Sequence, residues 1–147
     1  RHCQAEHNVA EDYYIRDAIL TPLGRKQAKE LNESTKETVQ KDVELIVSSP
    51  LRRTIQTTLD GYPGAISRLG GKEKIILLPQ AQECNDFPCD TGSVRSELEK
   101  DSEFDGLDMS ALSDDWVSKA GQYASSTSAL KARARYVRQF LRSRPEK

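Results

Sequence analysis

Two short apolar runs set the main constraint on how this chain can fold. The first, "VELIV" at residues 43–47, stops just before Pro50, and the second, "KIILLP", occupies residues 74–79. Short runs of this kind, rich in β-branched residues, are typical of buried strands. The stretch "LRRTIQTTLD" at residues 51–60, between them, predicts a helix. Since strand-then-helix alternation favours parallel pairing, the order predicts an α/β domain with helices packed on a parallel sheet.

Further elements are predicted on either side. Thr21 is a good helix cap and Pro22 suits the first helical position, so a helix is expected in "LTPLGRKQAKELNES". Glycine and proline predict loops at residues 61–72 and 80–93, and the acidic residues 94–121 are expected to be short-helical. Residues 128–144 form the clearest helical pattern. Its apolar face consists of Leu130, Ala134, Val137 and Leu141.

Only two strands are convincing, and a two-stranded sheet makes a poor core, so the chain corresponds to the middle of an α/β domain. The 147 residues fit one domain, residues 1–147, and the net charge of −1 argues against a general polyanion binder or membrane-surface binder. No apolar run has the length of a membrane span or a signal-peptide core. We therefore expect a soluble intracellular protein of the cytoplasm, with the nucleus as a further compartment.

The cysteines point away from a covalent or metal framework. The chain has an odd number of cysteines, Cys3, Cys84 and Cys89, and no two of them have Cys-x-x-Cys spacing. Neither a disulfide framework nor a structural zinc site is expected from this pattern, and reduced thiols are the simpler interpretation.

Three polar stretches are candidates for chemistry, each with a plainer alternative. Arg1 and His2 open the chain, where a tag remnant or a frayed terminus would serve as well. Arg52 and Arg53 lie where the first strand passes into a helix, a place that favours anions, although a solvated basic helix face also accounts for them. Glu83 lies just past the second strand, as a general acid beside a phosphate or as an ordinary loop residue.

These stretches together resemble the motifs of the histidine phosphatase superfamily, in the branch with phosphoglycerate mutase-like folds. "RHCQAEHN" resembles the family's Arg-His-Gly motif, with Cys3 in place of glycine and Asn8 a few residues on. "LTPLGRKQA" and "SSPLRRTIQT" resemble the next two signatures, and the second identifies Arg53, not Arg52, as the phosphate-binding arginine. "QECNDFPCDTGS" resembles the acidic segment of fungal-type members and points to Glu83. The resemblance implies a three-layer α/β/α fold with a mostly parallel sheet.

The resemblance also implies a mechanism for phosphomonoester hydrolysis. His2 would attack phosphorus and form a phosphohistidine, while Arg1 and Arg53 clamp the phosphoryl oxygens. Glu83 would protonate the leaving alcohol and then assist water, and Asn8 would hydrogen-bond the phosphoryl group or the substrate. The expected partner is a small phosphorylated substrate, with no metal and no other cofactor.

Two pieces of the family pattern are missing from the sequence. The family's first strand would precede Arg1, and its second histidine, in a Thr-His-Gly-like motif, would follow Lys147. His7 is the only other histidine and is too close to His2 along the chain for that role. We therefore expect a fragment or a truncated product of an active phosphatase, weak or inactive by itself.

Three alternatives stay open beside the phosphatase interpretation. One is a mutase of the phosphoglycerate type, and another is a phospholigand-binding or interaction domain that has lost turnover. The third is nucleic-acid binding through the basic helix, although a solvated helix that covers the sheet explains it better and no nucleic-acid partner is expected. The basic residues of that helix are Lys131, Arg133, Arg135, Arg138, Arg142 and Arg144.

Overall fold

Two very short strands pair in parallel in the middle of the chain. The computed structural model describes residues 2–146. In it, β1 (Val47–Ser48) pairs in parallel with β2 (Ile76–Leu77), with Val47 opposite Ile76 and Ser48 opposite Leu77. The predicted parallel α/β arrangement is confirmed. The strands are shorter than predicted, because regular pairing begins only at Val47 and ends at Leu77.

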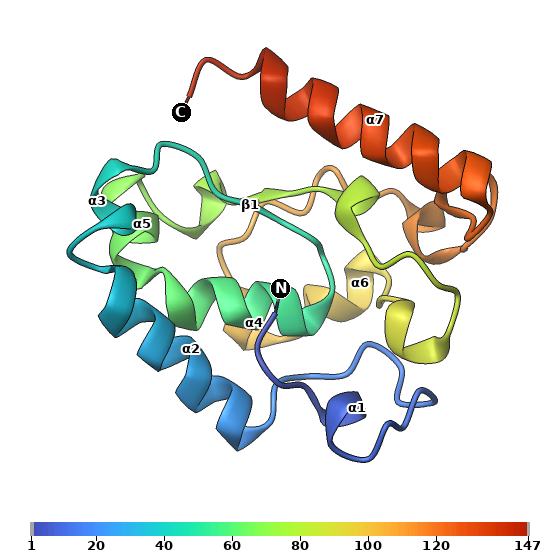
Figure 1. Cartoon of the computed structure of the whole chain (residues 1–147), viewed down its shortest axis with the longest axis horizontal. Helices are drawn as coiled ribbons and strands as arrows, with labels where there is room; N and C mark the ends of the chain where they lie inside the picture. Colours follow the sequence, from blue (N-terminus) through green and yellow to red (C-terminus); the bar gives the residue numbers. More distant parts are fainter. Residues whose placement is uncertain (1, 147) are drawn as a thin grey trace.

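The helix predicted between the strands is α4 (Arg52–Gly61), and it packs against the predicted N-terminal helix, α2 (Pro22–Thr35). Both are visible as neighbouring helices in Figure 1. The cap of α2 is as expected, since Thr21 Oγ1 accepts a hydrogen bond from Gly24 N at 3.0 Å. Two shorter helices, α1 (Glu6–Val9) and α3 (Val39–Asp42), lie before and after α2.

The prediction of a loop at residues 61–72 is wrong, because α5 (Pro63–Arg68) lies within it. Proline at the first helical position favours a helix start, and the deciding contact comes from elsewhere in the chain. Buried Gln40, on α3, accepts a hydrogen bond from Ala65 N at 3.1 Å through its Oε1 atom. It also donates from Nε2 to the Gly61 carbonyl at 3.1 Å. These bonds satisfy backbone groups at the junction of α4 and α5. Because their partner, Gln40, lies outside residues 61–72, a local sequence pattern does not predict them.

The core lies between α4, the strand pair and the acidic region that follows. Leu51, Ile55 and Leu77 form one cluster with Phe104 and Trp116, all at most 2% exposed. The acidic region is short-helical as predicted, and its elements are α6 (Arg95–Leu98), η4 (Ser102–Phe104), η5 (Asp114–Val117) and η6 (Gly121–Tyr123). Apolar side chains from each of these elements close the core, because Leu98, Phe104, Trp116 and Tyr123 are all buried.

Gly92 packs directly against Trp116, the only tryptophan of the chain. A Cβ atom at Gly92 would lie 1.9 Å from Cη2 of Trp116, well inside van der Waals contact. Trp116 is fully buried, so its indole has no free space into which it could move. The position therefore requires glycine for packing.

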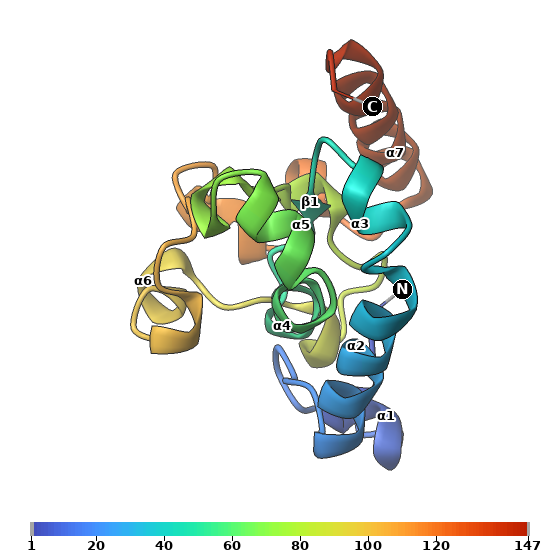
Figure 2. The same cartoon turned by 90° about the vertical axis from the view of Figure 1, so that its left-hand side faces the viewer.

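The long C-terminal helix, α7 (Thr127–Ser143), is present as predicted, but it does not cover the strands. It packs against η6 and against η2 (Pro79–Ala81), the turn that follows β2. Figures 1 and 2 show α7 at the opposite end of the molecule from α1. Leu141 is consequently 46% exposed, although it was predicted on the packed face. Within residues 2–146, no helix combines the length and apolar character that a membrane crossing needs.

Candidate active site

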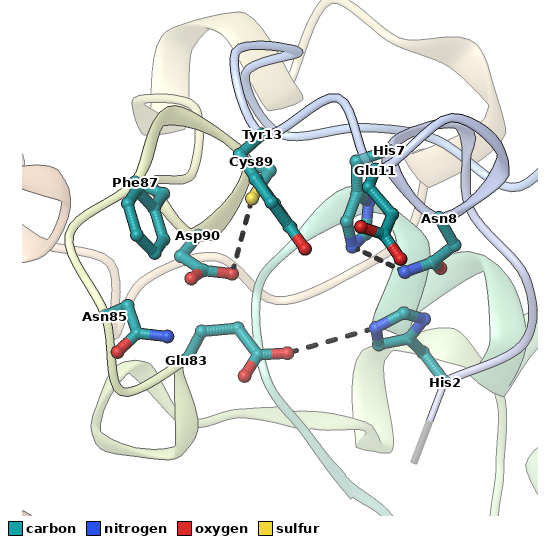
Figure 3. A pocket seen from close by; sticks show the side chains of 10 residues that line it. All are labelled: His2, His7, Asn8, Glu11, Tyr13, Glu83, Asn85, Phe87, Cys89 and Asp90. Atoms are coloured by element: carbon teal, nitrogen blue, oxygen red, sulfur yellow. Dashed lines mark hydrogen bonds and ion pairs between the residues drawn. The ribbon is translucent and has the colours of Figure 1, made fainter.

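A cavity of about 690 Å³ lies between the N-terminal segment and the loop that follows β2. Figure 3 shows side chains from these two segments facing each other across it. The loop contains η3 (Pro88–Asp90). Another short turn, η1 (Lys72–Lys74), lies before β2 and outside this loop. The cavity is lined by His2, His7, Asn8, Glu11, Tyr13, Glu83, Asn85, Phe87, Cys89 and Asp90.

The N-terminal segment is held in place by α2 and α4. Cys3 N donates to Thr57 Oγ1 on α4 at 3.1 Å, and Gln4 N donates to Gln27 Oε1 on α2 at 2.9 Å. Ala5 forms an antiparallel bridge with Leu20, just before α2. These bonds fix the backbone on the C-terminal side of His2, so the imidazole starts from a defined position.

His2 is oriented by its own backbone neighbour. Its Nδ1 atom lies 2.7 Å from the Cys3 carbonyl oxygen. A carbonyl can only accept, so Nδ1 carries the hydrogen, and in the neutral ring Nε2 bears the lone pair. Nε2 lies 3.9 Å from Glu83 Oε1, and the His2 side chain is only 6% exposed. The imidazole therefore presents a nucleophilic nitrogen to the carboxylate across the cavity (Figure 3).

Arg53 lies beneath the same carboxylate. It comes from the first turn of α4 and is fully buried, and its Nη2 lies 3.2 Å from Glu83 Oε1 and 3.5 Å from Asp90 Oδ1. Its Nη1 donates to the Cys89 carbonyl at 2.6 Å. His2 Nε2 and the Arg53 guanidinium thus both lie near one carboxylate oxygen, Glu83 Oε1. A phosphoryl group entering here would meet a nucleophile, a cation and a proton carrier within one small volume.

The neighbouring arginine has a different role. Arg52 Nη1 forms an ion pair with Asp101 at 2.7 Å, and Arg52 N donates to Asp17 Oδ1 at 2.9 Å. Asp17 is 3% exposed and also accepts from Ser93 N at 3.0 Å and Ser93 Oγ at 2.8 Å. Burial raises the pKa of the Asp17 carboxyl, against the lowering effect of these bonds. Arg52 and Asp17 therefore join three separate segments, away from the cavity.

The structure brings together His2, Arg53 and Glu83 as the sequence analysis expected. Asn8 lines the cavity together with His2 and Glu83, whereas Arg53 is fully buried behind its wall. Asn8 Oδ1 accepts from Ala5 N at 3.0 Å, and its Nδ2 lies 3.0 Å from His7 Nε2. Arg1, the second predicted phosphate ligand, lies outside the described residues.

Sequence reasoning missed several residues of the cavity wall. The His7 ring lies 5.8 Å from the His2 ring between centroids, because α1 turns the chain back toward His2. Burial, and then the charge of Arg53, lower the pKa of His7, so the neutral ring is favoured. Tyr13, Phe87 and Asp90 also line the cavity. No spacing rule connects them with His2, although Phe87 and Asp90 lie inside the segment already picked out for Glu83.

Two cations hold the backbone behind Glu83. Arg133 Nη2 donates to the Glu83 carbonyl at 3.1 Å, and Lys119 Nζ donates to the same oxygen at 3.3 Å. Arg133 is only 5% exposed, so its assignment to a solvated basic face is wrong. Burial, and then the charge of Arg133, lower the pKa of Lys119 to about 8. The helix α7 thereby contributes to the position of Glu83 without entering the cavity.

Metal ligation has no candidate cluster in this part of the chain. Among residues 2–146, no group of three or more histidine, cysteine, aspartate or glutamate side chains is placed to hold an ion.

Several known proteins are similar to this chain in sequence. The model of the histidine phosphatase superfamily (branch 1) matches residues 1–147. A probable phosphatase of Schizosaccharomyces pombe is 34% identical over 151 residues, covering 100% of this chain and 68% of the relative. A phosphoglycerate mutase-like protein of Arabidopsis thaliana is 30% identical over 149 residues, covering 78% of this chain and 54% of the relative.

A solved structure shares the fold. Mycobacterial hydrolase 1 superposes with a TM-score of 0.53 at 24% identity, covering 99% of this chain and 64% of that protein. The chain thus spans between about half and two thirds of the length of these proteins. The phosphoglycerate mutase-like α/β class expected from the sequence is therefore confirmed.

Proposed function

We propose that this chain, which belongs to the histidine phosphatase superfamily, is a phosphomonoester hydrolase that works through a phosphohistidine. The names of its relatives, a probable phosphatase and phosphoglycerate mutase-like proteins, support a phosphatase or a mutase-type activity. The small phosphorylated substrate would bind in the cavity between the N-terminal segment and the loop after β2.

One observation carries this proposal: His2 Nε2 and Arg53 Nη2 approach the same oxygen of Glu83, at 3.9 and 3.2 Å. The Nε2 lone pair attacks phosphorus, and the bond from phosphorus to the ester oxygen breaks. Glu83 in its protonated form gives its proton to that oxygen, so the alcohol leaves neutral. Water then attacks the phosphohistidine while Glu83 takes a proton from it, and phosphate leaves with the His2 lone pair restored.

Arg53 offsets the charge that develops on the phosphoryl oxygens. Its Nε is buried and has no hydrogen-bond partner among the described residues, and its Nη2 is occupied by carboxylates. Phosphoryl binding would replace Glu83 Oε1 on Nη2, which frees that carboxyl to act on the leaving oxygen. We propose Arg1 as a second cation and Asn8 Nδ2 as a hydrogen-bond donor to the phosphoryl group.

The test is the covalent intermediate. The chain is incubated with p-nitrophenyl phosphate at mildly acidic to neutral pH and quenched in base, and the phosphate on histidine is located by mass spectrometry. We expect slow nitrophenol release and a phosphate label on histidine in the unchanged chain, neither in His2→Ala, and retained label in the matched variant His7→Ala. Label that persists in His2→Ala, or no label in any of the three, would refute the proposal.

Mutase activity is the second candidate, because the Arabidopsis relatives are named phosphoglycerate mutase-like. It differs in the fate of the phosphohistidine, which would pass to a second alcohol rather than to water. Incubating the phosphorylated chain with glycerate separates the two activities. Transfer of the phosphoryl group to glycerate supports a mutase, and its release only as inorganic phosphate supports a phosphatase.

A further inference from the structure

Two aromatic side chains form one wall of the cavity. Tyr13 and Phe87 stack with ring centroids 5.6 Å apart and an angle of 26° between the planes. Cys89 N donates to the Tyr13 carbonyl at 3.0 Å, which ties the two segments together. Tyr13 and Phe87 are 46% and 49% exposed as residues, so both are still substantially open to water. Figure 3 shows the Tyr13 hydroxyl pointing into the cavity.

The charge of the remaining wall is unfavourable for an anionic leaving group. Glu11 and Asp90 line the cavity in addition to Glu83, and Asn85 is neutral. Asp90 is 3.5 Å from the buried Arg53, whereas Glu11 is an exposed residue. The lowered pKa of His7 means that this second imidazole does not add a reliable positive charge. A second carboxylate or phosphate on the substrate would therefore be repelled.

We propose that the site takes phosphomonoesters of neutral aromatic alcohols, with the aromatic ring of the leaving group lying against Phe87 and Tyr13. The inference rests on the proposed function, because it assigns the phosphoryl group to His2 and Arg53. A flat ring is favoured over an aliphatic chain because an exposed aromatic face gains stacking energy beyond the burial of apolar area. The cavity of about 690 Å³ has room for one ring and a phosphoryl group.

The experiment measures binding of phosphonates, which the enzyme cannot hydrolyse, and therefore does not depend on turnover. Benzylphosphonate, propylphosphonate and 2-carboxyethylphosphonate are titrated into the chain by calorimetry. We expect benzylphosphonate to bind about threefold to tenfold more tightly than propylphosphonate, the range that aromatic pairs give. The carboxylated analogue is expected to bind more weakly than propylphosphonate.

Two variants and one matched control locate the effect. Phe87→Ala is expected to remove the benzyl preference, and Phe87→Leu, which keeps an apolar side chain without a flat face, to reduce it. Tyr14→Ala is the control, because Tyr14 is 86% exposed and does not line the cavity. It should leave all three affinities unchanged. Fluorescence of buried Trp116 verifies that each variant is folded.

The outcomes separate this inference from the proposed function. Equal binding of the benzyl and propyl compounds, or a benzyl preference that survives in Phe87→Ala, would overturn the aromatic specificity even if the phosphohistidine forms. A benzyl preference without any phosphohistidine would instead overturn the hydrolase and retain the aromatic site. Failure of all three phosphonates to bind would overturn both.

Discussion

The strongest test of how α7 supports the site is the substitution Arg133→Met. The Arg133 guanidinium is buried and donates one hydrogen bond to the Glu83 carbonyl at 3.1 Å, beside Lys119 at 3.3 Å from the same oxygen. Methionine keeps an unbranched side chain of similar reach but removes the charge and the donors. The change therefore loosens the backbone behind Glu83 without opening a large cavity in the packing.

The expected stability change is small because two contributions oppose each other. A hydrogen bond from a charged donor contributes about 1.5–3 kcal/mol. However, Arg133 Nε and Nη1 are buried without a hydrogen-bond partner among the described residues, so the variant also removes two unpaired donors. Each unpaired donor costs about 1–3 kcal/mol. Because the penalty removed is comparable to or larger than the hydrogen-bond energy lost, we expect the free energy of unfolding to fall by no more than about 1 kcal/mol.

The substitution should clearly raise the pKa of Lys119. Both cations donate to one oxygen, so their nitrogens lie within about 6 Å, and their repulsion at an effective dielectric constant of 20–60 is about 1–3 kcal/mol. Burial remains in the variant and still lowers the pKa of Lys119. We therefore expect this pKa to rise from about 8 in the unchanged chain toward the ordinary value of a lysine in Arg133→Met.

The assays are the pH dependence of Lys119 acetylation, followed by mass spectrometry, and urea unfolding. Arg135→Met is the matched control, because Arg135 lies on the same helix and is exposed. We also expect kcat/KM for p-nitrophenyl phosphate to fall about tenfold in Arg133→Met, since small misplacement of the proposed proton donor, Glu83, is costly. An unchanged pKa of Lys119, or a loss of stability above about 3 kcal/mol, would refute this account.

Three further predictions concern the frame around the site. Asp17→Asn should lower the free energy of unfolding by about 2–4 kcal/mol in urea, because a buried carboxylate that accepts three hydrogen bonds is replaced by a group with one acceptor, while exposed Asp12→Asn should change it little. Gly92→Ala should displace Trp116 and shift its fluorescence emission to the red, and an unchanged spectrum would show that the ring has room. The lowered pKa of Lys119 means that the unfolded chain binds more protons between pH 8 and 10.5, so stability should rise with pH there relative to Lys119→Gln, and a constant difference between the two would contradict it.

The local sequence determined the order of elements and indicated the candidate site residues. Apolar runs around Val47 and Ile76 predicted a parallel pair, and Thr21 with Pro22 predicted the start of α2. The motif that contains Arg53 placed it at the beginning of α4, where the structure has it. These predictions succeeded because strand pattern, helix caps and short motifs depend on residues within a turn or two of each other.

The tertiary structure alone decided which distant residues surround those groups. The buried bonds of Gln40 accompany α5 in a segment that its glycines had marked as a loop. Arg133, 50 residues from Glu83 along the chain, has the same pattern as its solvated neighbours until packing buries it against that carbonyl. The stacking of Tyr13 on Phe87 likewise joins segments that no local spacing connects. Such contacts depend on how helices and loops pack in three dimensions, and a one-dimensional pattern of polar and apolar residues does not contain that information.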